Sequence, residues 1–309
     1  MKVRQLIGGI ASGYAYKAVL LASTLFLVPF FLRESVFGIE GYGTIFAILA
    51  YVNVLALFTG PLYLSFSRTI SSAVGEIGHA GRCDTQHPLG TGLKVLLGAC
   101  GVLTGATILW RAELLGWIGL EPTPDAQLAL ALAAASYAME NGLILFRVPL
   151  ITRGEIAFVN GVLMLEAAFR AVAFLVVFTL GPAAIAHYFA VQLGFVALRQ
   201  LALFGRLRIR FPEDLRGSVR APWLRDLRSL RYSLSVTALT TSDMLVERIP
   251  VLLASRFFGP AESGYVALTI HTIRGNVLQA FSTVLQPIAV PVAARLDPRR
   301  MATNRVDFL

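Results

Sequence analysis

Long apolar stretches alternate with short polar islands along this chain of 309 residues. A helix that crosses about 30 Å of hydrocarbon needs roughly 20 largely apolar residues. Such a segment has to be helical, because lipid offers no partner to an unpaired backbone group. The pattern therefore predicts an all-α polytopic membrane protein with about eight transmembrane helices, over residues 6–32, 42–66, 92–118, 126–150, 157–180, 183–205, 231–256 and 264–291.

Composition agrees with this interpretation and narrows the classes of function. Hydrophobic residues make up 56% of the chain and charged residues 15%, whereas a soluble domain carries about a quarter charged residues. The first apolar segment contains Lys17 and runs on to Leu32, which favours a retained span over a cleaved signal peptide. No motif for a nucleotide, a metal or a nucleophilic catalyst occurs in the sequence, so we expect neither an enzyme nor a bound cofactor.

Basic residues gather in the islands on one side of the predicted membrane. The net charge is +9, and most Lys and Arg lie near the N-terminus, at Arg68 and Arg82, at Arg153, between residues 206 and 231, and in the C-terminal tail. The positive-inside rule then places both termini in the cytoplasm. We expect a multi-pass protein of the cytoplasmic membrane, whose positive charge reflects topology and not binding to nucleic acid.

The longest island is a basic cytoplasmic linker over residues 206–230. Its second half places Leu224, Leu227 and Leu230 three residues apart, with an arginine next to each. This spacing predicts a short amphipathic helix on the membrane surface, with its arginines near anionic headgroups. The linker either fixes topology and joins two halves of the protein, or captures lipid or substrate.

One stretch of the sequence occurs twice. The chain reads PFFLRESVFGIEGYG from Pro29 and PVLLASRFFGPAESGY from Pro250. Identical residues recur at an offset of 221, and after an insertion the tyrosines also match: Pro29 and Pro250, Leu32 and Leu253, Phe37 and Phe258, Gly38 and Gly259, Tyr42 and Tyr265. Six predicted helices separate the copies, so both have the same orientation and form parallel repeats. We therefore expect a six-helix lobe over 1–205, the linker over 206–230, and the start of a second lobe with a polar tail over 231–309.

The residues of these two hairpins resemble a known family. LVPFFLRESVFGIEGYGTIFAIL and VLLASRFFGPAESGYVALTIHTI are similar to the first hairpin of each lobe in bacterial polysaccharide exporters of the O-antigen flippase (Wzx-like) type. That family belongs to the multidrug/oligosaccharidyl-lipid/polysaccharide (MATE-like) exporter superfamily. The resemblance implies two facing bundles and the transfer of undecaprenyl-diphosphate-linked glycan between leaflets, in O-antigen, lipopolysaccharide or other surface polysaccharide biosynthesis. The family usually has twelve to fourteen helices, so we interpret the chain as a C-terminally shortened member.

Charged residues inside the predicted spans are the candidate site. A charge at the bilayer centre costs about 2.5–3.5 kcal/mol on insertion scales, so such residues usually face a cavity or a partner. A diphosphate headgroup needs cations, and we expect them to be Lys17, Arg170, Arg248 and Arg274. The alternative for each is an internal salt bridge, of Arg170 with Glu166, of Arg274 with Asp243 or Glu247, and of Lys17 with Glu140. Arg199 is interpreted as a snorkelling residue near a helix end.

Acidic residues in the spans offer a second role. Asp243 and Glu247 lie one helical turn apart, and crowding of two carboxyls favours proton coupling, to which Glu140 is a further candidate. Acidic coupling would equally suit a multidrug or organic-cation antiporter of the same fold, and a non-transporting remnant is the third interpretation. The expected partners are lipid-linked oligosaccharide and membrane lipids, with a glycan polymerase and glycosyltransferases as candidate protein partners.

Overall fold

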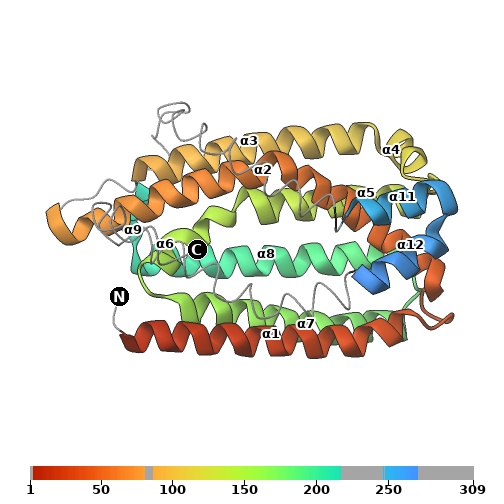
Figure 1. Ribbon diagram of the computed structural model, residues 1–309, viewed down its shortest axis with the longest axis horizontal. Coiled ribbons are helices and arrows are strands. Elements are labelled where there is room, and N and C mark those ends of the chain that lie inside the picture. The colour runs from red at the N-terminus through yellow and green to blue at the C-terminus, as the bar shows by residue number, and fades with distance from the viewer. Residues whose placement is uncertain (1–2, 81–85, 217–245, 247, 271–309) are drawn as a thin grey trace.

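The computed structural model describes residues 3–80, 86–216, 246 and 248–270, and every regular element in these ranges is a helix (Figure 1). The elements in chain order are α1 Val3–Phe31, α2 Gly38–Ala80, α3 Gln86–Leu109, α4 Arg111–Trp117, α5 Pro124–Gly142, η1 Ile144–Phe146, α6 Arg147–Thr152, α7 Ile156–Leu180, α8 Ile185–Arg210, α9 Pro212–Arg216, α11 Ile249–Phe258 and α12 Pro260–Ala267.

Six of these helical segments are long and apolar enough to cross a membrane. They are Ile7–Phe31, Gly38–Ser72, Pro88–Leu109, Pro124–Thr152, Ile156–Leu180 and Ile185–Arg210. The first six predicted spans are therefore confirmed as membrane-length apolar helices, and the chain has the character of a multi-pass membrane protein. Large parts of the predicted spans 231–256 and 264–291 lie outside the described residues, so the count of eight stays a prediction.

Two helix ends differ from the prediction because hydropathy marks the membrane and not the helix. The 43 residues of α2 give a length of about 65 Å, roughly twice the hydrocarbon thickness, so Arg68 lies within a helix and not in a loop. Similarly, α8 continues through Arg206 to Arg210. It ends at Phe211, whose backbone leaves the helical region (φ −139°, ψ 56°), as expected for a residue that precedes a proline.

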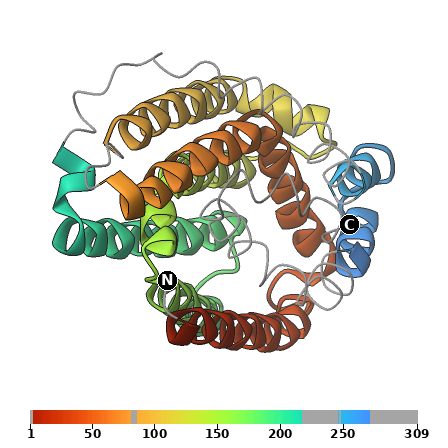
Figure 2. The ribbon, with the colours of Figure 1, turned by 60° about the vertical axis from the view of Figure 1, so that its left-hand side comes forward.

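The spans pack in an order that differs from their order in the chain. Helix α1 packs on α7, α7 on α8, α8 on α5, α5 on α3, and α3 on α2. In the described residues α1 and α2 share no extensive contact, although a six-residue turn joins them. The helices thus follow an open arc that begins at α1 and ends at α2 (Figure 2). Figure 2 also shows that α2 is bent, for which Pro61 inside it provides the physical reason.

Polar contacts fix particular helix pairs within the arc. The Asp125 carboxylate accepts the backbone N–H groups of Ile185 (2.9 Å) and Ala186 (3.2 Å), so a residue of α5 caps the start of α8. The Asn160 side chain on α7 donates to the Gly9 carbonyl and to the Ser12 hydroxyl of α1, each at 3.0 Å. These contacts set the register of α5 against α8 and of α1 against α7. They also pair polar groups that lipid would leave without a hydrogen-bond partner.

The two copies of the repeated stretch turn at equivalent glycines, although residues 32–37 form a non-helical turn before the first glycine and residues 253–258 are helical before the second. Gly38 and Gly259 both have a positive φ, of 62° and 102°. Each donates its N–H to the carbonyl five residues earlier, Gly38 to Arg33 (3.0 Å) and Gly259 to Ala254 (3.1 Å). Glycine adopts positive φ at no steric cost, which explains why it occurs at both turns.

The second helices of the two hairpins, α2 and α12, also cross each other closely. A methyl group built at Gly264 would lie 2.6 Å from the Ile39 carbonyl oxygen, and one built at Gly43 would overlap the Pro260 carbonyl oxygen. Ile39 and Pro260 stand at the 221 offset, and so do Gly43 and Gly264. The contact is therefore reciprocal: Gly43 lies against the carbonyl of Pro260, and its equivalent, Gly264, lies against the carbonyl of Ile39.

Candidate functional site

Five charged side chains from four helical segments form a continuous chain of ion pairs in the bundle. Arg199 on α8 lies between two carboxylates, with 2.9 Å from its Nη2 to Glu140 Oε1 and 2.9 Å from its Nη1 to Glu166 Oε2. Glu140 also pairs with Arg147 (3.5 Å), and Glu166 with Arg170 (3.2 Å). The order is Arg147–Glu140–Arg199–Glu166–Arg170, hereafter the charge chain, and its formal charge is +1.

The charge chain lies at mid-span, between two apolar clusters. On α7, Glu166 is about 15 Å from the start of the helix and about 21 Å from its end, and Arg170 is about 21 Å from the start and about 15 Å from the end, at 1.5 Å per residue. One cluster contains Phe174 and Phe189, and the other contains Val159 and Leu203. On α7 and α8 the charged residues therefore lie between the apolar side chains of the two clusters. The charge chain thus has one apolar layer on each side along the helix axes.

A break in the fourth span brings two members of the charge chain into place. Helix α5 ends at Gly142, a short 3₁₀ turn follows, and α6 begins at Arg147. The Gln200 side chain donates to the Glu140 carbonyl oxygen (3.3 Å), just before the break. Interrupted helices at the middle of a membrane are tolerated where polar groups compensate the backbone, and they are common at binding sites of transporters.

The two carboxylates of the charge chain differ in their surroundings. Both oxygens of Glu166 are engaged, one by Arg170 and one by Arg199, and its side chain is 6% exposed. The side chain of Glu140 is 36% exposed, and both of its ion pairs use the same oxygen, Oε1. Glu166 is thus a fixed internal counter-ion, whereas Glu140 forms the accessible part of the charge chain.

Of the sequence-predicted cations, Arg170 belongs to the charge chain, and its pairing with Glu166 one turn away is confirmed. Lys17 lies half-buried on α1 with its Nζ 5.8 Å from the centroid of the Tyr16 ring, and it pairs with no carboxylate among the described residues. Arg248 directly precedes α11 and is half-buried. The remaining predicted site residues lie outside the described residues: Arg274, Asp243 and Glu247.

The charge chain corrects two details of the sequence interpretation. Arg199 is not a snorkelling residue, since its side chain is 6% exposed and lies between two glutamates. Glu140 pairs with Arg199 and Arg147 and not with Lys17. Arg147, which the sequence reasoning passed over, could have been found from its position two turns after Glu140 within the same apolar segment.

A second group of ion pairs lies at the end of the bundle that carries the basic islands. Arg153 pairs with Asp214 (2.7 Å) and Arg206 with Glu155 (2.7 Å). These contacts hold α9 and the end of α8 against the turn between α6 and α7. Their place at a helix–helix connection, together with their close pairing, points to a structural role.

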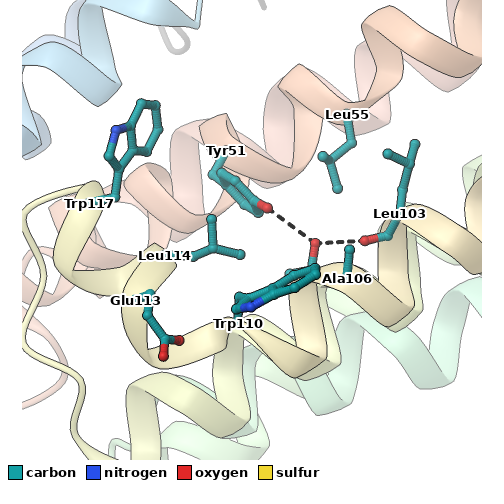
Figure 3. A pocket seen from close by; sticks show the side chains of 9 residues that line it. Tyr51, Leu55, Leu103, Ala106, Trp110, Glu113, Leu114 and Trp117 are labelled. Carbon is teal, nitrogen blue, oxygen red and sulfur yellow. Dashed lines mark hydrogen bonds between the residues drawn. The ribbon is translucent and has the colours of Figure 1, made fainter.

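A cavity of about 460 Å³ lies at the opposite end of the bundle, between α2, α3 and α4 (Figure 3). Its polar contacts are internal, since the Tyr51 hydroxyl lies 3.2 Å from the Thr107 hydroxyl, which donates to the Leu103 carbonyl. Trp110 and Trp117 on its rim are exposed, as tryptophans at a membrane–water interface commonly are. The rest of the lining consists of the apolar residues Leu55, Ala106 and Leu114 and one carboxylate, Glu113. The cavity lies away from the charge chain.

These features define a multi-pass helical membrane protein with a buried, net-positive ion-pair chain at mid-span. No group of His, Cys, Asp and Glu among the described residues has the arrangement of a metal site. No family model, curated protein or solved structure matches the chain.

Proposed function

We propose that this protein moves a lipid-linked oligosaccharide, of the undecaprenyl-diphosphate type, across the bacterial cytoplasmic membrane during surface polysaccharide biosynthesis. The observation that carries the proposal is the charge chain within a six-span apolar bundle. Each charge at the bilayer centre costs about 2.5–3.5 kcal/mol on insertion scales, and apolar side chains of similar volume often pack equally well. Five ionised groups at this depth are therefore better explained by function than by stability.

The sign of the charge favours an anionic substrate. Three arginines face two glutamates in the charge chain, and Lys17 adds a mid-span cation without a carboxylate partner among the described residues. Guanidinium groups bind phosphate oxygens with two parallel hydrogen bonds. A multidrug or organic-cation antiporter would need an acidic group that is free to bind a cation. Both glutamates of the charge chain are instead neutralised by arginine, which weighs against that alternative.

The two-lobe arrangement is part of the same proposal. Its support is the equivalent turns at Gly38 and Gly259, and the reciprocal crossing of Gly43 and Gly264. A contact of this kind is what a local twofold relation between two hairpins produces. By this account α11 and α12 begin a second lobe that meets the first at the N-terminal end of α2.

The orientation is proposed from the distribution of charge along the bundle. The end of α8, α9 and the turn between α6 and α7 lie together at one end, at the left of Figure 1, and carry Arg153, Arg206, Arg208 and Arg210. The opposite end carries Glu113, Asp125 and Glu262. By the positive-inside rule this end would be cytoplasmic, together with the start of α1. The cytoplasmic C-terminus stays a prediction from the sequence.

Glycan display tests the proposal in cells that depend on this protein. Lys17→Ala and Arg248→Ala are expected to lower surface polysaccharide and to leave membrane insertion intact, because each removes a half-buried cation from the spans. Arg208→Ala is the matched control, since Arg208 is exposed at the end of α8. Lipid-linked intermediates should accumulate in the inner leaflet of the two test strains. Normal amounts of surface polysaccharide in both strains would rule out a role for these two cations in the proposed transport.

A further inference from the structure

The charge chain contains hydrogen-bond donors that the protein itself leaves unused. Arg147 Nε and Arg199 Nε are buried and have no hydrogen-bond partner in the part of the chain that the structure describes. Arg199 Nη2, in contrast, is engaged by Glu140 Oε1 at 2.9 Å. Buried guanidinium donors without acceptors are unfavourable, and a native structure that retains them calls for an explanation.

The two arginines that carry these donors share a single oxygen of one carboxylate. Arg147 and Arg199 converge on Oε1 of Glu140, whereas Glu166 holds Arg199 and Arg170 with separate oxygens. One carboxylate oxygen shared by two arginines cannot satisfy two guanidinium forks. A group with several anionic oxygens could satisfy both forks at once.

We propose that Arg147 and Arg199 form a subsite for a phosphate-type oxyanion, and that Glu140 is the counter-ion which this ligand displaces. The inference rests on the proposed function and deepens it, because it adds Arg147 and Arg199 to the headgroup contacts expected at Lys17, Arg170, Arg248 and Arg274. The unused Nε donors, together with the Nη2 groups that Glu140 would release, supply the hydrogen bonds that a tetrahedral oxyanion accepts.

Glu140 is the displaceable member because it is the accessible one. Its side chain is 36% exposed, against 6% for that of Glu166. Glu166 keeps Arg199 in place from the other side through Oε2 (2.9 Å), so Arg199 remains oriented when Glu140 leaves. In the absence of ligand Glu140 neutralises the two arginines, and in its presence the ligand takes over that role.

The test measures binding of diphosphates to the purified full-length protein in lipid nanodiscs. The probes are farnesyl diphosphate, which presents a diphosphate from the membrane, inorganic pyrophosphate, which presents it from water, and farnesol as the uncharged control. The variants are Glu140→Gln and Arg147→Gln. Glu155→Gln and Arg206→Gln are matched controls, because they make the same chemical changes in an ion pair at the end of the bundle.

The proposal predicts opposite effects for the two members of one ion pair. Glu140→Gln removes the competing carboxylate and should tighten diphosphate binding about tenfold, whereas Arg147→Gln should weaken it about tenfold. The two control variants should stay within about twofold of the wild type. Arg147→Lys, which keeps the charge and loses the fork, serves if Arg147→Gln does not fold, and should weaken binding about fivefold.

Three results would overturn the subsite: a wild-type affinity for farnesyl diphosphate no higher than for farnesol, a Glu140→Gln affinity equal to or below that of the wild type, or unchanged binding in the Arg147 variants. Equal affinity for inorganic pyrophosphate and farnesyl diphosphate, with the expected pattern of variants, would support the subsite and remove the lipid-linked substrate from the proposed function. The two failures are therefore distinguishable.

Discussion

Replacing Gly43 by alanine adds one methyl group where α2 and α12 cross. That group would overlap the Pro260 carbonyl oxygen, and it would lie 2.7 Å from the Pro260 carbonyl carbon and 2.8 Å from the Gly264 nitrogen. All three atoms belong to backbone, so no side-chain rotation relieves the overlap and the two helices have to separate. Overpacking of this kind costs about 1–3 kcal/mol of folding free energy.

The reciprocal contact makes a second, linked prediction at Gly264. A methyl group there would lie 2.6 Å from the Ile39 carbonyl oxygen, so Gly264→Ala should destabilise the protein by a similar amount. The double variant should lose less than the sum of the two, because the first separation of the helices already makes room for the second methyl. Gly60→Ala is the control, since it lies on the same helix and a methyl group there meets nothing within 4 Å.

Thermal unfolding in detergent, followed by the loss of monodisperse protein, measures these effects. With a shift of about 2–4 °C per kcal/mol, Gly43→Ala and Gly264→Ala should each melt roughly 2–12 °C below the wild type. Gly60→Ala should melt at or above it, because alanine is favoured over glycine in a helix by up to about 1 kcal/mol. Wild-type melting of both variants would refute the close crossing. A large effect at one glycine and none at the other would refute the equivalence of the two hairpins.

Three further variants test the packing around the site. Arg199→Met should lower the unfolding free energy by about 3–5 kcal/mol, because it leaves the buried Glu166 with one arginine fewer and Glu140 without its closest partner. A melting point within error of the wild type would contradict the ion-pair chain. Asp125→Ala should cost about 0.5–2 kcal/mol and increase amide hydrogen exchange at the first turn of α8, and unchanged exchange there would count against the cap. Asn160→Leu should cost about 1 kcal/mol in thermal unfolding, since it removes two hydrogen bonds between α7 and α1, and equal stability would show that the pair packs without them.

The sequence predicted those features that depend on local pattern. Six spans followed from apolar length, and the pair Arg170–Glu166 followed from the spacing of one helical turn. The ends of α2 and α8 did not follow, because a helix can continue into water after its apolar segment ends. Hydropathy therefore located the membrane better than it located the helix termini.

The charge chain could not be read from the sequence for a different reason. Arg199 is 33 residues from Glu166 in the chain, and it reaches Glu140 on a different helix, so both contacts depend on which helices become neighbours. The same holds for the crossing of Gly43 with the second hairpin. The repeat indicated that two similar turns exist, but their direct contact arises only from tertiary packing.

Transport by the purified protein tests the central claim most directly. The measurement is the movement of a fluorescent polyprenyl-diphosphate oligosaccharide between the leaflets of reconstituted vesicles, with wild-type protein, with Arg170→Gln and with no protein. Our account predicts that the wild type accelerates movement far above empty vesicles, and that Arg170→Gln slows it about tenfold through the loss of one charge-assisted phosphate contact. Wild-type vesicles no faster than empty ones, or a variant as fast as the wild type, would contradict a role for the charge chain in moving an anionic headgroup.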